Sequence, residues 1–209
     1  MRSKATLILL SIGLLLTLSA SPFVTAQGSQ EATPELMTRI MMMPPDAEVT
    51  GMHIDANGHF FVNAMHPDEA NYKATVGVIN GVDWNNLAET VPELDASSSE
   101  NDIWHGIRTS HGTYQVVLQS GDALSEGGVA GGIYAADDGN QLLVSKKPDY
   151  NAFVPLADDG KRGYLYTAWE DRPAGISQVE IEWDSASSEW NLLNSKMLDL
   201  SSINGGWGL

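Results

Sequence analysis

Residues 53–65 read HIDANGHFFVNAM and place a polar turn between two apolar segments. The Asn57-Gly58 pair at the centre is a strong short-range signal for a β-hairpin, because a type I′ turn needs positive φ at both central positions. The same order of strand, polar turn and strand recurs further along the chain, with turns at 137–140, 158–160 and 184–188. The sequence therefore predicts an all-β fold made of antiparallel hairpins.

The arrangement of these hairpins bears on the type of all-β fold. Hairpins with Asp-Gly turns and tryptophan-ended strands are typical of propeller blades. Their spacing along the chain is irregular, so they do not form a short-period repeat. We expect a β-propeller-like fold of antiparallel hairpin blades, with a β-sandwich as the main structural alternative.

The first 26 residues have the features of an export signal. Arg2 and Lys4 precede an apolar run, ATLILLSIGLLLTLSA, and VTA before Gln27 is a small-residue cleavage site. The run has about 16 residues, short of the ~20 that span a bilayer, which disfavours a membrane anchor. Residues 27–35 are polar and are predicted to form a flexible linker. We therefore expect an exported protein, periplasmic or extracellular, with no membrane span after cleavage.

The charge of the chain restricts its partners. The 209 residues include 11 Lys and Arg, 27 Asp and Glu, and no cysteine. Cleavage removes Arg2 and Lys4, so the mature chain carries 9 minus 27, or −18. Such a charge argues against nucleic acid or an anionic membrane as a partner. It is compatible with hard cations, which take oxygen ligands, but solubility alone explains it more simply.

The sequence lacks the common hydrolase motifs, with no G-x-S-x-G elbow and no H-E-x-x-H. His53 and His59 flank the predicted turn and are interpreted as surface or packing residues. Glu170 follows the apolar strand YLYTAW, where a buried carboxylate is costly unless it is paired or ligated. An ion pair with Arg172 is the alternative to ligation. His66 ends another predicted strand, and its role stays open.

Three segments resemble the PhoX-type alkaline phosphatases. They are AEVTGMHIDANGHFFVNAMHPDEA (47–70), PDYNAFVPLADDGKRGYLYTAWEDRPAGISQVEIEWD (148–184) and LDLSSINGGWGL (198–209). The resemblance implies a secreted β-propeller that hydrolyses phosphate monoesters with a mixed calcium and iron cluster. It also implies that Glu48 is a metal ligand and that Glu170 is a second one. No catalytic residue is assigned by either line of reasoning.

The chain departs from that family's pattern in three ways. The AEVTG segment comes early here and late in the family, the cysteine expected after GGWG is absent, and Trp169 replaces a histidine. The expected acidic ligands that follow the cysteine are absent too. Residues 36–209 are therefore predicted to form a single β domain, a partial PhoX-like propeller whose active site is incomplete, with the remaining ligands expected beyond Leu209.

Two other functions stay open. The first is a non-catalytic, secreted calcium-binding or interaction module that keeps only the fold. The second is a hydrolase that uses Glu48 and Glu170 as acid and base, which needs the two carboxyl groups within about 5–10 Å of each other. Neither the natural substrate nor the oligomeric state follows from the sequence.

Overall fold

The computed structural model describes residues 38–67, 73–87, 90–94, 97–99, 103, 106–135 and 137–200. The regular elements of this part of the chain are all β-strands, which confirms the predicted all-β class. The predicted export signal (1–26) and linker (27–35) lie outside the described residues, as do residues 201–209 of the C-terminal motif.

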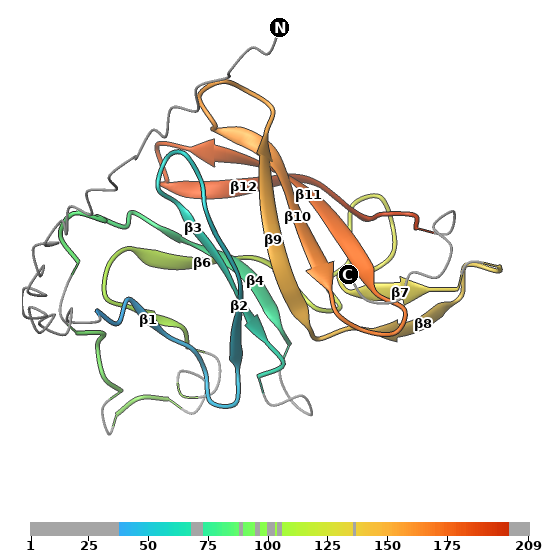
Figure 1. The fold of residues 1–209 in the computed structure, drawn as a ribbon, viewed down its shortest axis with the longest axis horizontal. Helices are drawn as coiled ribbons and strands as arrows, with labels where there is room; N and C mark the ends of the chain where they lie inside the picture. Colours follow the sequence, from blue (N-terminus) through green and yellow to red (C-terminus); the bar gives the residue numbers. More distant parts are fainter. Residues whose placement is uncertain are drawn as a thin grey trace, which may run out of the picture. The chain divides into compact units, whose positions relative to one another are not determined.

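Two four-stranded antiparallel sheets form most of the fold (Figure 1). The first sheet contains, in spatial order, β2 (Glu48–Ile54), β3 (Phe60–Met65), β4 (Thr75–Asn80) and β6 (Thr113–Gln119). The second contains β9 (Pro148–Pro155), β10 (Arg162–Trp169), β11 (Gly175–Asp184) and β12 (Glu189–Met197). The spatial order of each sheet follows the order of its strands in the chain, so each sheet is a meander.

Two short pairs of strands accompany the sheets. They are β1 (Met41–Met42) with β5 (Arg108–Thr109), and β7 (Gly132–Tyr134) with β8 (Gln141–Val144). The four predicted turns are confirmed, because they join β2 to β3, β7 to β8, β9 to β10, and β11 to β12. The chain therefore follows the predicted hairpins closely.

The predicted type I′ geometry of the first turn is wrong. Gly58 has a φ of 86°, but Asn57 is not among the residues with positive φ. Instead, Oδ1 of Asp55 accepts backbone N–H groups from Asn57 at 2.9 Å and from His59 at 2.8 Å. A short acidic side chain can organise a turn by bonding to the backbone that follows it. Asp55 therefore holds a wider loop in place of a two-residue turn.

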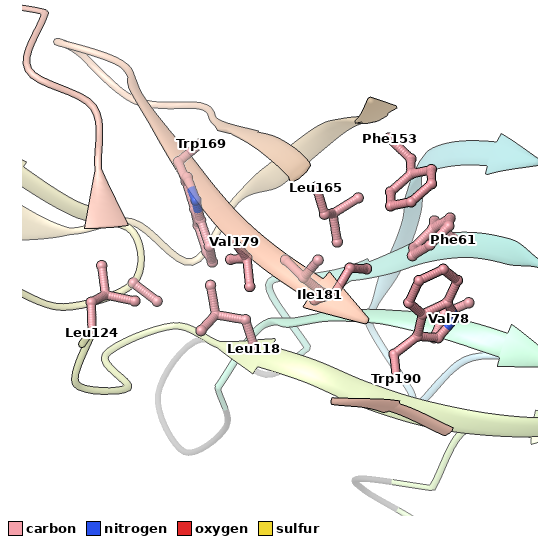
Figure 2. Close-up of a cluster of buried hydrophobic side chains, with 12 residues drawn as sticks. Phe61, Val78, Leu118, Leu124, Phe153, Leu165, Trp169, Val179, Ile181 and Trp190 are labelled. Carbon is pink, nitrogen blue, oxygen red and sulfur yellow. The ribbon is translucent and has the colours of Figure 1, made fainter. Parts of the chain in front are cut away.

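The two sheets pack against each other through buried apolar side chains (Figure 2). The rings of Phe61 and Phe153 stack with centroids 5.5 Å apart, and Trp190 lies 5.8 Å and 5.4 Å from them. Each fully buried side chain of this size contributes roughly 1.5–3 kcal/mol through removal from water. The other labelled members are Val78, Leu118, Leu124, Leu165, Trp169, Val179 and Ile181.

The two sheets differ in how their outer faces are covered. Every residue of β3 and β4 is buried, because a second cluster packs Met41, Trp84 and Tyr114 against the face opposite the main core. In β10 and β11 burial alternates along the strand, as in a sheet with one covered face. Within the described residues, the two central strands of the first sheet are thus enclosed on both sides, whereas its edge strands β2 and β6 are partly exposed.

Tyr114 should make the stability of the fold sensitive to alkaline pH. Its hydroxyl donates to the Val62 carbonyl at 3.0 Å. Burial raises the pKa of Tyr114 above its ordinary value of 10.0, and the weaker opposing effect is a hydrogen bond with Thr75. Near pH 10, therefore, only the unfolded chain releases the hydroxyl proton of Tyr114. The free energy of unfolding should be unaffected by Tyr114 below about pH 10 and fall above it, by up to about 1.4 kcal/mol per pH unit.

Urea denaturation between pH 8 and pH 11.5 measures this fall. Tyr114→Phe should remove that part of the slope, whereas Tyr150→Phe, at a tyrosine that is 61% exposed, should keep it. Equal slopes for Tyr114→Phe and the unmodified protein would contradict the prediction.

Candidate functional site

Glu48 and His66 meet at one end of the first sheet. Glu48 is the first residue of β2, and it pairs with Met65, the last residue of β3. This register places Oε2 of Glu48 3.4 Å from Nε2 of His66, with the side chains 60% and 28% exposed. The backbone N–H of His66 donates to the Lys146 carbonyl at 2.9 Å, which anchors the strand end. A carboxylate and an imidazole are therefore held side by side and open to solvent.

Glu170 lies at the corresponding end of β10. Its N–H donates to the Lys147 carbonyl at 2.7 Å, and its own carbonyl accepts the Ser145 hydroxyl at 3.0 Å. The segment 145–147, between β8 and β9, thus links the ends of β3 and β10. We call Glu48, His66 and Glu170 the strand-end cluster. Backbone bonds thus place His66 and Glu170 against the same short segment, and Glu48 lies beside His66.

The expected burial of Glu170 is wrong. Trp169 is the last buried residue of β10, and the Glu170 side chain beyond it is exposed. Among the described residues, neither Arg172 nor any other cation forms an ion pair with it. Because water solvates this carboxylate, its position alone creates no need for a ligand or a partner. Its predicted metal role now depends on the PhoX resemblance and on its place in the strand-end cluster.

Trp169 is a structural residue. It is fully buried, and its indole Nε1 donates to the Ser177 hydroxyl at 2.9 Å. Its aromatic ring also lies where a Cβ on Gly131 would come within 2.9 Å of it. The histidine that the PhoX resemblance implies at this position is therefore replaced here by a core side chain.

The AEVTG segment (47–51), which contains Glu48, contacts the first strand of the second sheet. The Thr50 hydroxyl donates to the Pro148 carbonyl at 2.5 Å. Gly51 has a φ of 61°, and a Cβ there would lie 2.2 Å from Nδ2 of Asn63. Only glycine suits both the backbone angle and the space. The motif therefore has a structural role, which is to let Asn63 reach across to the second sheet.

A buried polar network joins the two sheets at this point, and the sequence analysis missed it. Asn63 donates to the Pro148 carbonyl at 3.1 Å, and Asn151 donates to Oδ1 of Asn63 at 2.7 Å. The Thr167 hydroxyl donates to Oδ1 of Asn151 at 2.7 Å. Asn63, Asn151 and Thr167 are each at most 1% exposed. The only sequence signal was a single asparagine inside the apolar strand FFVNAM.

His59 and His53 have the packing roles that were predicted for them. Nδ1 of His59 lies 2.8 Å from Oδ2 of Asp55, and its ring centroid lies 4.4 Å from that of Trp183. The ring of His53 lies 6.2 Å from that of Phe61. The Asp55–His59 contact was not predicted, although both residues flank the same turn. A carboxylate at Nδ1 orients an imidazole, and here that orientation fixes the ring against the tryptophan.

The described side chains do not complete a metal site. In this part of the chain, no group of three His, Cys, Asp or Glu side chains could hold a metal ion. Glu48 and His66 are suitable donors in kind, because calcium takes carboxylates and iron takes carboxylates and imidazoles. Two donors are fewer than the six to eight ligands of calcium. The metal roles of Glu48 and Glu170 and the calcium and iron cofactors stay predictions.

Among the described residues, no helix has both the length and the apolar character required to cross a bilayer. Comparison of the chain with protein-family models, curated proteins and solved structures found no match. The PhoX resemblance therefore stays a prediction that rests on the quoted segments.

Proposed function

We propose that the chain is a PhoX-like, metal-dependent phosphomonoester hydrolase, exported from the cell, with its site at the strand-end cluster. The single observation that carries this proposal is the contact of 3.4 Å between Glu48 and His66. Both residues come from one of the segments that resemble the family, and Glu170 comes from another. Lys146 and Lys147, whose carbonyls accept the backbone N–H groups of His66 and Glu170, are cations of the kind that attract phosphate oxygens.

The topology supports a propeller over a sandwich as the complete fold. Propeller blades are four-stranded meanders, whereas immunoglobulin-type sandwiches connect their sheets by Greek-key crossings. Both sheets here are meanders in chain order. Their first strands, β2 and β9, are connected by the bond from Thr50 to the Pro148 carbonyl. Two adjacent blades of a partial ring would have this arrangement, with the strand-end cluster at the mouth.

In this site the residues of the chain would bind a metal ion and orient its ligands. Glu48 would supply a carboxylate oxygen to a calcium or iron ion, and His66 would hold that carboxylate or contribute its own nitrogen. When bound, the metal would neutralise charge on the phosphoryl oxygens. Because the described donors are too few for a complete site, no further step is assigned to them.

The effect of Glu48→Gln tests the proposal. The change removes the carboxylate charge but keeps the shape, so metal affinity and turnover of p-nitrophenyl phosphate should both fall by at least about tenfold. Metal content per chain is measured by inductively coupled plasma mass spectrometry after dialysis against calcium and iron. Glu189→Gln is the matched control, because Glu189 is also an exposed glutamate at the first position of a strand.

Each outcome of this experiment has a clear meaning. A Glu48→Gln protein with the metal content and rate of the unmodified chain would overturn the proposed site. Calcium binding without turnover in the unmodified chain would favour the non-catalytic calcium-binding module. The exposed Glu48–His66 pair is compatible with that module as well, because such a pair can bind an ion without chemistry.

A further inference from the structure

A pocket of about 280 Å³ lies on the first sheet, on the face away from the second sheet. Three paired residues form its sheet side: Ala64 of β3 is opposite Thr75 of β4, and Thr75 is opposite Gln119 of β6. Its volume is close to the lower limit of about 300 Å³ for small-molecule sites. The pocket therefore offers space for one small ligand.

The wall formed by Tyr114 depends on a glycine. A Cβ on Gly77 would lie 2.3 Å from Cζ of Tyr114, so the absence of a side chain lets the ring lie across β4. The hydroxyl of Tyr114 then reaches the Val62 carbonyl of β3 at 3.0 Å. A ring fixed in this way spans three strands and gives the pocket a rigid aromatic edge.

The polar side of the pocket offers hydrogen-bond donors from Lys73 and Gln119. The Lys73 ammonium lies 2.7 Å from Oδ1 of Asp122. Oδ2 of Asp122 accepts the backbone N–H of Gln119 at 2.9 Å, so the carboxylate is itself held in place. An ammonium has three donors, and this pair uses one. Among the described residues, the side-chain amide of Gln119 has no hydrogen-bond partner, which leaves it available to a ligand.

The opposite side of the pocket is apolar. Pro44, Pro67, Ile107 and Val116 line it, and Val116 is 47% exposed. Apolar walls with a few converging polar groups are the usual composition of a small-molecule site. Here the polar groups include two side chains with free donors, and one of them carries a positive charge in a chain whose net charge is −16.

We propose that this pocket binds a small molecule with an anionic oxygen head, a carboxylate or a phosphonate-like group, and a short aromatic or aliphatic body. Lys73 and Gln119 donate to the head, and Val116, Ile107 and the two prolines contact the body. Asp122 offsets part of the charge of Lys73 while orienting it, so the affinity is weak. The site depends on none of the strand-end cluster residues and stands apart from the proposed phosphatase activity.

The proposal is tested by titrating ¹⁵N-labelled protein with three probes and following amide chemical shifts. The probes are benzoate, phenylphosphonate, which is no phosphate ester, and neutral benzyl alcohol. Both anions should shift the amides of Thr75 and Val116, with benzyl alcohol binding at least about fivefold more weakly. Equal binding of benzyl alcohol and both anions would overturn recognition of the head, and no binding of any probe would overturn the site.

Two pairs of variants locate the binding. Lys73→Met should remove the preference for the anions, whereas Lys196→Met should keep it, since Lys196 is also paired with an acid, Glu126. Val116→Trp should fill the pocket and abolish the shifts. Val154→Trp is its control, because both valines are 47% exposed and lie on edge strands. Unchanged binding by Lys73→Met or Val116→Trp, with the fold confirmed by its amide spectrum, would overturn the proposal.

Discussion

Replacing Trp169 by alanine should lower the free energy of unfolding by about 3–5 kcal/mol. The indole is fully buried among the side chains that join the two sheets (Figure 2). Its removal leaves a cavity that the rigid backbone of β10 and β11 cannot fill. It also leaves the Ser177 hydroxyl, itself fully buried, without the donor now 2.9 Å away. Urea denaturation followed by circular dichroism measures the loss.

Two variants make the Trp169 result specific. Trp169→Phe should lose less than alanine does, because it keeps most of the ring volume and gives up only the remainder of the indole and the hydrogen bond. Tyr150→Ala removes a large aromatic group that is 61% exposed, and it should change stability by less than about 1 kcal/mol. A loss below about 1 kcal/mol for Trp169→Ala would show that this end of the core is not closely packed.

Replacing Asn63 by alanine should cost about 2–4 kcal/mol, nearly as much as a large core truncation. The amide links the first sheet to Asn151 and to the Pro148 carbonyl, and water cannot reach the groups that it leaves behind. A buried amide without a partner bears the full cost of its lost hydration. Asn191→Ala, at an exposed asparagine of β12, should be nearly neutral.

A double-mutant cycle with Asn151→Ala separates the hydrogen bond from the lost volume. Once Asn63 is gone, removing Asn151 should cost less than it does in the unmodified protein, with a coupling free energy of about 1–2 kcal/mol. Simple additivity of the two changes would contradict a direct interaction. The cycle uses the same denaturation measurement as the Trp169 series.

The hairpins were predictable because their signals are local. Each of the four predicted turns joins two strands that are consecutive in the chain. The details of the first turn were not predictable from Asn57-Gly58 alone. Asp55 bonds to the backbone on the far side of the loop, and that competing interaction outweighed the preference of the pair for a type I′ turn.

The site was only partly predictable, because it depends on the exact register of a hairpin and on the contact of His66 with a distant segment of the chain. The contact between Glu48 and His66 follows from the register of β2 with β3, which shifts at the irregularity between Thr50 and His53. Sequence reasoning chose these residues through a resemblance, without this geometry. It placed Glu170 in a buried setting because the strand before it is apolar, but burial ends one residue earlier, at Trp169.

The meander order of the two sheets has a kinetic consequence. Most of the strand pairs join segments that are adjacent in the chain, so closing them costs little loop entropy. The Asn63–Asn151 bond instead spans 88 residues. Proteins rich in local pairings fold quickly, and distant pairings slow them. Each sheet can therefore form as its own folding unit. Joining the two sheets is the long-range step, in which the Asn63 amide pairs with Asn151 as the interface between the sheets becomes buried.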